Sequence, residues 1–136
     1  MANSKYEIEI QSNPTNLITI EEFISYVAKE EGLDPDKLPG LLIAITEATT
    51  NAIIHANKKD ESKKVFISVD REENKLIFVI KDEGLGFDPE NIPDPTAPEN
   101  LMKDSGRGLY LMRIFCDELK YNITPTGTET ILIVSV

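Results

Sequence analysis

The segment 41–56 constrains the fold most, because it is a long helix-forming run rich in Ala, Ile and Leu. It falls short of the roughly 18 apolar residues that cross a membrane, so we expect it to be buried against the rest of the chain. Glu47, Asn51 and His55 follow one another along it at i, i+4 and i+8, and this spacing places them on one helix face. The sequence therefore predicts an apolar helix that presents a carboxylate, an amide and an imidazole along one side, and a solvated helix face is the alternative.

The rest of the chain indicates strands and further helices. Strands are predicted at residues 6–10, 65–69, 75–80, 119–124 and 130–136, with 70–74 as the turn of a hairpin. Asn13-Pro14 and Gly32 are typical of the start and the end of a first helix, and residues 108–117 resume helical spacing. This order predicts an α/β (α+β) two-layer sandwich, in which helices cover one face of a mixed β-sheet.

Length and charge exclude several classes of protein. The 136 residues suffice for one domain, so we expect a single domain over residues 1–136. Lys and Arg number 14 against 24 Asp and Glu, and the net charge of −10 disfavours nucleic acid and anionic membranes as partners. Because the sequence shows neither a membrane-spanning run nor a signal peptide, we expect a cytoplasmic protein. Cys116 is the single cysteine, and we expect it in the core.

A glycine-containing segment, Asp82-Glu-Gly84-Leu-Gly86-Phe87, directly follows the predicted strand 75–80. The two glycines allow the backbone to approach a ligand closely. A buried carboxylate at a strand end can accept a hydrogen bond from an exocyclic amine, and would favour adenine over guanine by about 1–3 kcal/mol. The alternatives are an ordinary loop or a fragment of a calcium loop, although the alternating acidic ligands and terminal Glu of a calcium site are missing.

A second glycine-containing segment, Ser105-Gly106-Arg107-Gly108-Leu109, immediately precedes the predicted helix 108–117. The free N–H groups at a helix N-terminus suit phosphates, and Arg107 could add a charge-assisted contact. A simple helix-entry turn is the alternative. Between the two glycine segments, four prolines interrupt any periodicity, and such a stretch predicts a functional loop. No P-loop or GxGxxG motif is present, so the common nucleotide folds are not indicated.

Together the three segments form an ordered set of motifs that covers nearly the whole chain. The sequence resembles the GHKL-type (Bergerat) ATPases, which include DNA gyrase, a large heat-shock chaperone and histidine kinases. It is most similar to the anti-sigma-factor serine/threonine kinases of bacterial partner switching. The matching residues are Glu47-x3-Asn51-Ala52, Asp82-x-Gly84-x-Gly86-Phe87 and Gly106-Arg107-Gly108-Leu109-x-Leu111-Met112.

The resemblance implies a histidine-kinase-like ATPase fold and a role for each motif. Asn51 would coordinate a Mg²⁺ ion that bridges the phosphates of ATP, and Glu47 would act as the general base. Asp82 would bind the adenine amine, and Gly84 and Gly86 would shape the pocket beside it.

The second glycine motif, Gly106, Arg107, Gly108 and Leu109, would hold the phosphates, and residues 88–105 would form the lid. Thr130 on the last strand would help to bind the adenine side. The proline-rich run 94–98 departs from the better-known members of the family. The lid is therefore the part in which this sequence matches the family least.

We therefore expect an ATP-dependent anti-sigma factor serine/threonine kinase, which phosphorylates a STAS-type anti-anti-sigma protein and sequesters a sigma factor. The alternative is a non-catalytic nucleotide-binding module for partner switching, and Glu47 favours the enzyme because binding alone needs no base. An ATPase that drives large conformational changes is a third class, usually attached to transducer domains. His55 is the only histidine, which excludes a self-contained histidine kinase. A homodimer is common in the resembled family, and the first helix and the strand before it are candidates for its contact surface.

Overall fold

The computed structural model describes residues 5–57, 60–84 and 112–136. The strands are β1 (Tyr6–Gln11), β2 (Lys64–Glu72), β3 (Lys75–Lys81), β4 (Glu118–Thr124) and β5 (Gly127–Ser135). The helices are α1 (Leu17–Glu30), α2 (Leu38–Thr50), the short 3₁₀ turns Pro14–Asn16 and Pro35–Lys37, and a π-helix at Asn51–Ala56. Residues 112–115 form a further helical turn. These elements confirm the predicted order of strands and helices.

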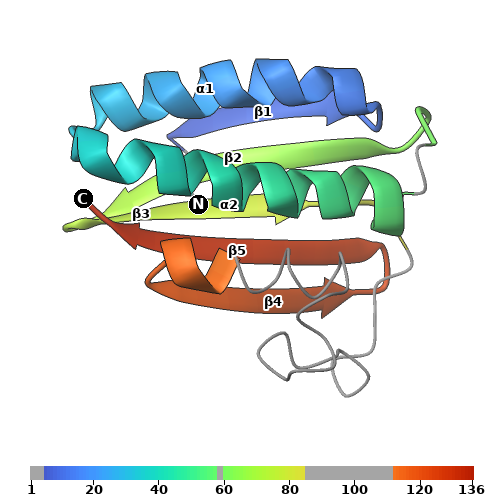
Figure 1. Ribbon diagram of the computed structural model, residues 1–136. Helices are drawn as coiled ribbons and strands as arrows, with labels where there is room; N and C mark the ends of the chain where they lie inside the picture. The colour runs from blue at the N-terminus through green and yellow to red at the C-terminus, as the bar shows by residue number, and fades with distance from the viewer. Residues whose placement is uncertain (1–4, 58–59, 85–111) are drawn as a thin grey trace, which may run out of the picture.

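The five strands form one sheet in the order β1-β2-β3-β5-β4, and α1 and α2 lie side by side over one face of it (Figure 1). All four strand pairings among the described residues are antiparallel. The two-layer prediction is therefore confirmed, but the described sheet is antiparallel and not mixed. Two helices between β1 and β2 carry the chain along the sheet and back again. Strand β2 therefore starts at the end where β1 stops, and runs antiparallel beside it.

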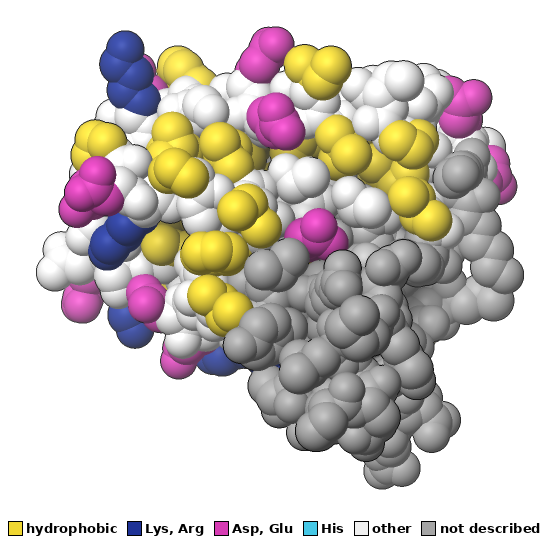
Figure 2. Space-filling model, in the orientation of Figure 1, with side chains coloured by type: hydrophobic (Ala, Val, Ile, Leu, Met, Phe, Trp, Pro, Cys, Tyr) yellow, Lys and Arg dark blue, Asp and Glu magenta, His cyan; other side chains and the backbone are white. Residues whose placement is uncertain are grey.

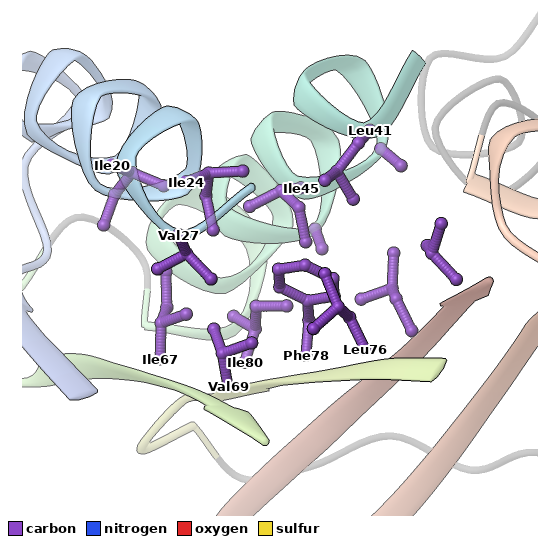
Figure 3. Packing of buried hydrophobic residues seen from close by; sticks show 14 of the residues in the cluster. Ile20, Ile24, Val27, Leu41, Ile45, Ile67, Val69, Leu76, Phe78 and Ile80 are labelled. Atoms are coloured by element: carbon purple, nitrogen blue, oxygen red, sulfur yellow. The ribbon is translucent and has the colours of Figure 1, made fainter. Parts of the chain in front are cut away.

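The core lies between the helix layer and the covered face of the sheet. Apolar side chains of α1 and α2 point toward those of β2 and β3, and Phe78 lies at the centre of the contact (Figure 3). Buried residues alternate along β3 with residues that are more exposed, mostly half-buried, as the period of two in a strand requires. Met112, the first residue of the helical turn 112–115, and Cys116, directly after the turn, also belong to this core. Burial raises the pKa of the Cys116 thiol to about 12, so the thiol stays protonated, as suits a core residue rather than a nucleophile.

The predicted helix 41–56 is one continuous helical segment that changes type part-way. It is α-helical to Thr50 and then forms the π-helix Asn51–Ala56. The N–H of Asn57 donates to the carbonyl of Ala52, five residues earlier, at 2.9 Å. Single π turns of this kind often occur at functional sites, because they change the direction in which the following side chains point.

A buried carboxylate joins the end of α1 to the edge of the sheet. The side chain of Glu31 is only 5% exposed, and it accepts hydrogen bonds from Lys5 Nζ at 2.8 Å and from the Tyr6 hydroxyl at 2.6 Å. Arg71 of β2 donates to the Glu31 carbonyl at 2.7 Å. The bond from Lys5, followed by that from Tyr6, holds the pKa of Glu31 below its ordinary value.

The outer surface of the helix layer is partly apolar. Figure 2 shows hydrophobic side chains among acidic ones on this side of the molecule. Ile18 and Tyr26 of α1 and Ile43 of α2 are exposed. In the ranges that the structure describes, no helix is both long and apolar enough to span a bilayer.

We predict that Glu31→Gln lowers the melting temperature at pH 7 and that this difference shrinks in acid. The folded pKa of Glu31 lies below its ordinary value of 4.5, so the stabilisation is present above about pH 4.5 and is lost as the pH falls through the lowered value. Thermal unfolding from pH 3 to pH 7 measures this. Glu21→Gln, at an exposed position of the same helix, is the control, and an equal effect of both substitutions would contradict the prediction.

Candidate functional site

Asp82 lies directly after β3 and is buried, with 5% of its surface exposed. Its Oδ1 accepts hydrogen bonds from the N–H groups of Gly84 at 3.0 Å and Thr128 at 3.1 Å, and its own N–H donates to the Thr128 carbonyl at 3.0 Å. Burial raises the pKa of Asp82, and the two N–H donors oppose part of that rise. Both bonds use one carboxylate oxygen. Among the described residues no hydrogen bond to Oδ2 is found, so this oxygen can accept one from a ligand.

Thr128 of β5 supplies a second polar group beside this carboxylate. The residue is 1% exposed, and its hydroxyl is buried without a hydrogen-bond partner among the described residues. A buried hydroxyl without a partner costs about 1–3 kcal/mol, and such groups are usually satisfied by water or by a ligand. The backbone of Thr128 is bonded to the Asp82 carboxylate, so two contacting residues supply an acceptor and a hydroxyl, a pair that suits the hydrogen-bonding edge of a nucleotide base.

Thr130, the predicted adenine-side residue, lies elsewhere along the same strand. It pairs with Ile80 of β3 and with Tyr121 of β4 and is half-buried. Thr128 could not be singled out from the sequence, because local sequence does not show which residues of two strands pair. Once Ile80 is paired with Thr130, two further residues along each strand bring Asp82 opposite Thr128.

Gly127 allows β5 to pass close to Asp82. Its φ is +157°, and a Cβ atom built on it would lie 1.9 Å from the backbone carbonyl oxygen of Asp82. No side chain fits in that space. Glycine is therefore required here for the close approach that brings Thr128 to the carboxylate.

Glu47 and Asn51 lie on the helix that covers this part of the sheet. Glu47 is in the last turn of α2, Asn51 is the first residue of the π-helix, and both are half-buried. Their neighbours Ala48 and Ala52 are buried in the core, so the two polar side chains lie at the border of the core. Within the described part of the chain, no hydrogen bond or ion pair is found for either side chain.

The remaining predicted site residues lie outside the described ranges. These are Gly86, Gly106, Arg107, Gly108, Leu109 and the lid at 88–105. The structure thus brings together Asp82, Gly84 and Thr128. It places Glu47 and Asn51 on the adjacent helix, without a direct hydrogen bond to Asp82.

A hollow of about 350 Å³ opens on the other face of the sheet, away from these residues. Glu7, Phe66, Val79 and Lys81 are among the residues that line it. They alternate along their strands with side chains of the core, so they face away from the helices. None of the candidate site residues in the described ranges lines this hollow.

This arrangement of a helix over the end of a sheet has counterparts among known proteins. Residues 10–134 match the family described as Histidine kinase-like ATPase domain. The chain belongs to this family. It is 32% identical to Serine-protein kinase RsbW of Bacillus subtilis (strain 168) over 125 residues, which are 87% of this chain and 78% of the relative. It is 36% identical to Anti-sigma F factor of the same organism over 120 residues, which are 84% of this chain and 77% of the relative.

Solved structures confirm the fold. The RsbU and RsbW domains of a Mycobacterium tuberculosis protein match with a TM-score of 0.66 at 15% identity, over 96% of this chain and 31% of that one. The mycobacterial sensor histidine kinase MprB matches with a TM-score of 0.59 at 16% identity, over 96% and 97% of the two chains. The predicted resemblance to GHKL ATPases and to anti-sigma-factor kinases is thus confirmed.

We predict that Gly127→Ala destabilises the protein by about 2–4 kcal/mol, because the added methyl group must displace the backbone at Asp82. Gly32→Ala is the matched control. Gly32 has a φ of +74° with no atom within 4 Å of the added Cβ, so its substitution adds backbone strain alone, about 1–2 kcal/mol. Urea unfolding of both variants measures the difference, and equal losses would show that the close approach carries no cost.

Proposed function

We propose that this chain is an ATP-dependent protein serine/threonine kinase of the anti-sigma type. Its membership of the histidine kinase-like ATPase family supports ATP as the nucleotide, and its relatives are named as a serine-protein kinase and an anti-sigma factor. The observation that carries the proposal is the buried pair of Asp82 carboxylate and Thr128 hydroxyl, at the end of a sheet that is covered by the helix bearing Glu47.

The Asp82–Thr128 pair binds the adenine. Oδ2 of Asp82 accepts a hydrogen bond from the exocyclic amine, and the Thr128 hydroxyl donates to a ring nitrogen. Guanine would place a carbonyl oxygen against the carboxylate, and the two acceptors would repel each other. An unpaired buried group of this kind costs about 1–3 kcal/mol, or roughly 5- to 150-fold in affinity. Gly84 keeps the backbone beside the carboxylate compact, and Gly86 is proposed to do the same.

Asn51 holds the magnesium ion that accompanies the phosphates. Its amide oxygen is the kind of hard ligand that Mg²⁺ accepts, and Mg²⁺ usually keeps few protein ligands alongside phosphate oxygens and water. Among the described residues, no group of three or more His, Cys, Asp or Glu side chains could hold a metal ion. A site of one amide and the nucleotide's own phosphates fits this composition. A magnesium ion held by Asn51 would supply positive charge beside the phosphates.

The remaining phosphate contacts are proposed for the segment that precedes the helical turn 112–115. Gly106, Gly108 and Leu109 supply backbone N–H groups at a helix start, and Arg107 supplies a positive charge. Residues 88–105 close over the bound nucleotide as a lid.

Glu47 is the general base for the transfer. Its carboxylate takes the proton from a serine or threonine hydroxyl of the partner, and the hydroxyl oxygen forms a bond to the γ-phosphorus. The bond between the γ-phosphorus and the bridging oxygen breaks, and ADP leaves with that electron pair. Asn51 follows Glu47 by one helical turn, so one helix supplies both the base and the metal ligand.

The partners proposed for this activity are proteins. The phosphate acceptor is a STAS-type anti-anti-sigma protein, and the protein that the chain sequesters is a sigma factor. A net charge of −10 disfavours direct contact with nucleic acid. A homodimer and a cytoplasmic location remain predictions from the sequence.

We predict that Glu47→Gln strongly slows phosphate transfer but keeps ATP binding, whereas Asn51→Ala loses the magnesium-dependent part of binding. Loss of a general base costs about 10²–10⁴-fold in rate, while the amide of Gln keeps the shape of the side chain. Calorimetry with ATP, with and without Mg²⁺, measures binding. Radiolabelled ATP and a purified STAS-type anti-anti-sigma protein measure transfer.

Two outcomes would contradict this assignment. Transfer undiminished in Glu47→Gln would remove Glu47 as the base. Nucleotide binding by the wild type without any transfer would favour the non-catalytic partner-switching module, in which the bound nucleotide only determines which partner surface is presented.

We predict that Thr128→Val leaves the nucleotide-free protein as stable as the wild type, or more so, and weakens ATP binding about tenfold. Valine has the same shape but removes a buried hydroxyl that lacks a partner among the described residues. Thermal unfolding and calorimetry measure the two effects. Thr130→Val is the comparison: if the loss of affinity follows Thr130 instead, the adenine contact belongs to the residue that the sequence pattern predicted.

A further inference from the structure

A buried amide connects three chain segments around the candidate site. Asn57 follows the π-helix and is fully buried. Its Nδ2 donates to Ser12 Oγ at 2.8 Å and to the Lys64 carbonyl at 3.1 Å. Its Oδ1 accepts from the N–H of Glu83 at 2.9 Å. Both amide hydrogens and the carbonyl oxygen are therefore used inside the protein.

The π turn determines where this amide points. The backbone N–H of Asn57 bonds to the carbonyl of Ala52, five residues back, whereas an α-helix would use the carbonyl four residues back. The wider turn rotates Asn57 relative to the α-helical positions before it. The π-helix therefore separates Asn51, which is proposed to hold magnesium, from Asn57, whose side-chain amide contacts Glu83.

The contact with Glu83 acts on residues 82–84, which we call the adenine loop because Asp82 is proposed to bind adenine. Glu83 lies between Asp82 and Gly84, so a bond to its N–H fixes the peptide that directly follows the Asp82 side chain. The Glu83 carboxylate also accepts a hydrogen bond from the N–H of Lys64. Because Asn57 donates to the carbonyl of the same Lys64, the loop is held from both sides.

The other end of the network secures Asn57 itself. Ser12 accepts one amide hydrogen, and its own hydroxyl donates to the Lys63 carbonyl at 2.7 Å. The chain after β1 and the start of β2 thereby fix the amide. A bond lost at Ser12 loosens this support but leaves the contact with Glu83 in place.

We propose that Asn57 is a positioning residue that sets the adenine loop at Asp82 relative to the helix bearing Glu47 and Asn51. This inference rests on the proposed function, which assigns Asp82 to the adenine and the helix bearing Glu47 and Asn51 to the phosphates. Asn57 does not touch the nucleotide. It acts through the Glu83 peptide. It thereby determines whether the adenine loop and the helix are positioned to bind the base and the phosphates of the same nucleotide.

The test compares Asn57→Ala with Ser12→Ala. Asn57→Ala removes the bond to Glu83, while Ser12→Ala removes a bond in the same network but keeps that contact. Two measurements are made well below the melting temperature of each variant. One is the affinity for ATP and for GTP with Mg²⁺ by calorimetry, and the other is amide hydrogen exchange of the segment 82–84 without nucleotide.

We expect Asn57→Ala to weaken ATP binding roughly tenfold, to reduce the preference for ATP over GTP, and to speed exchange at Glu83 and Gly84 by roughly tenfold. We expect Ser12→Ala to lower the melting temperature while changing neither preference nor exchange at these amides. If Asn57→Ala does not fold, Asn57→Ser, which keeps a small polar side chain but cannot reach Glu83 in the same way, takes its place.

A lower melting temperature with unchanged preference and unchanged exchange would overturn the proposal, because a purely structural contact gives that result. The two measurements, nucleotide binding and hydrogen exchange, also separate this inference from the proposed function. If the wild type binds neither nucleotide, the proposed function fails, and the exchange of Glu83 and Gly84 alone then decides whether Asn57 positions the loop.

Discussion

The burial of one face of the sheet under α1 and α2 is the constraint on which the rest of the structure depends. Phe78 and its neighbours on β2 and β3 need an apolar cover. Helix α2 and the π-helix that continues it provide this cover with Ala48 and Ala52 turned inward. The residues just before each of these alanines, Glu47 and Asn51, then lie at the border of the core. The packing that stabilises the fold thus also determines where the polar residues of the site lie.

Much of the fold could be predicted because it follows from local periodicity. The alternation in β1 and β3, the hairpin between β2 and β3 and the helices all appear in short windows of sequence. Strand direction and order could not be predicted in this way. They depend on which distant strands pair, and β5 pairs with both β3 and β4, a fact that no local pattern contains. The expectation of a mixed sheet failed for this reason.

In the candidate site too, some residues could be predicted from local sequence and others depend on contacts between segments. The location of Asp82 and Gly84 at the end of a strand could be predicted, because a carboxylate and a glycine directly follow an apolar run. Thr128 and Asn57 could not be singled out. The role of Thr128 depends on the register between β3 and β5. The role of Asn57 depends on a π turn and on three hydrogen bonds to residues outside its helix. An Asn or a Thr in isolation more often serves a turn or a cap.

The position of β5 also affects the order in which the molecule can be assembled. This strand follows β4 in the chain, yet it lies between β3 and β4 in the sheet. During synthesis, α1, α2 and the first three strands leave the ribosome together and can pack early, whereas contacts that are distant in sequence form later. Thr128 reaches Asp82 only when β5 inserts. A chain interrupted before Gly127 would therefore lose an interior strand and leave β4 without its neighbour, rather than lose a strand from the edge of the sheet.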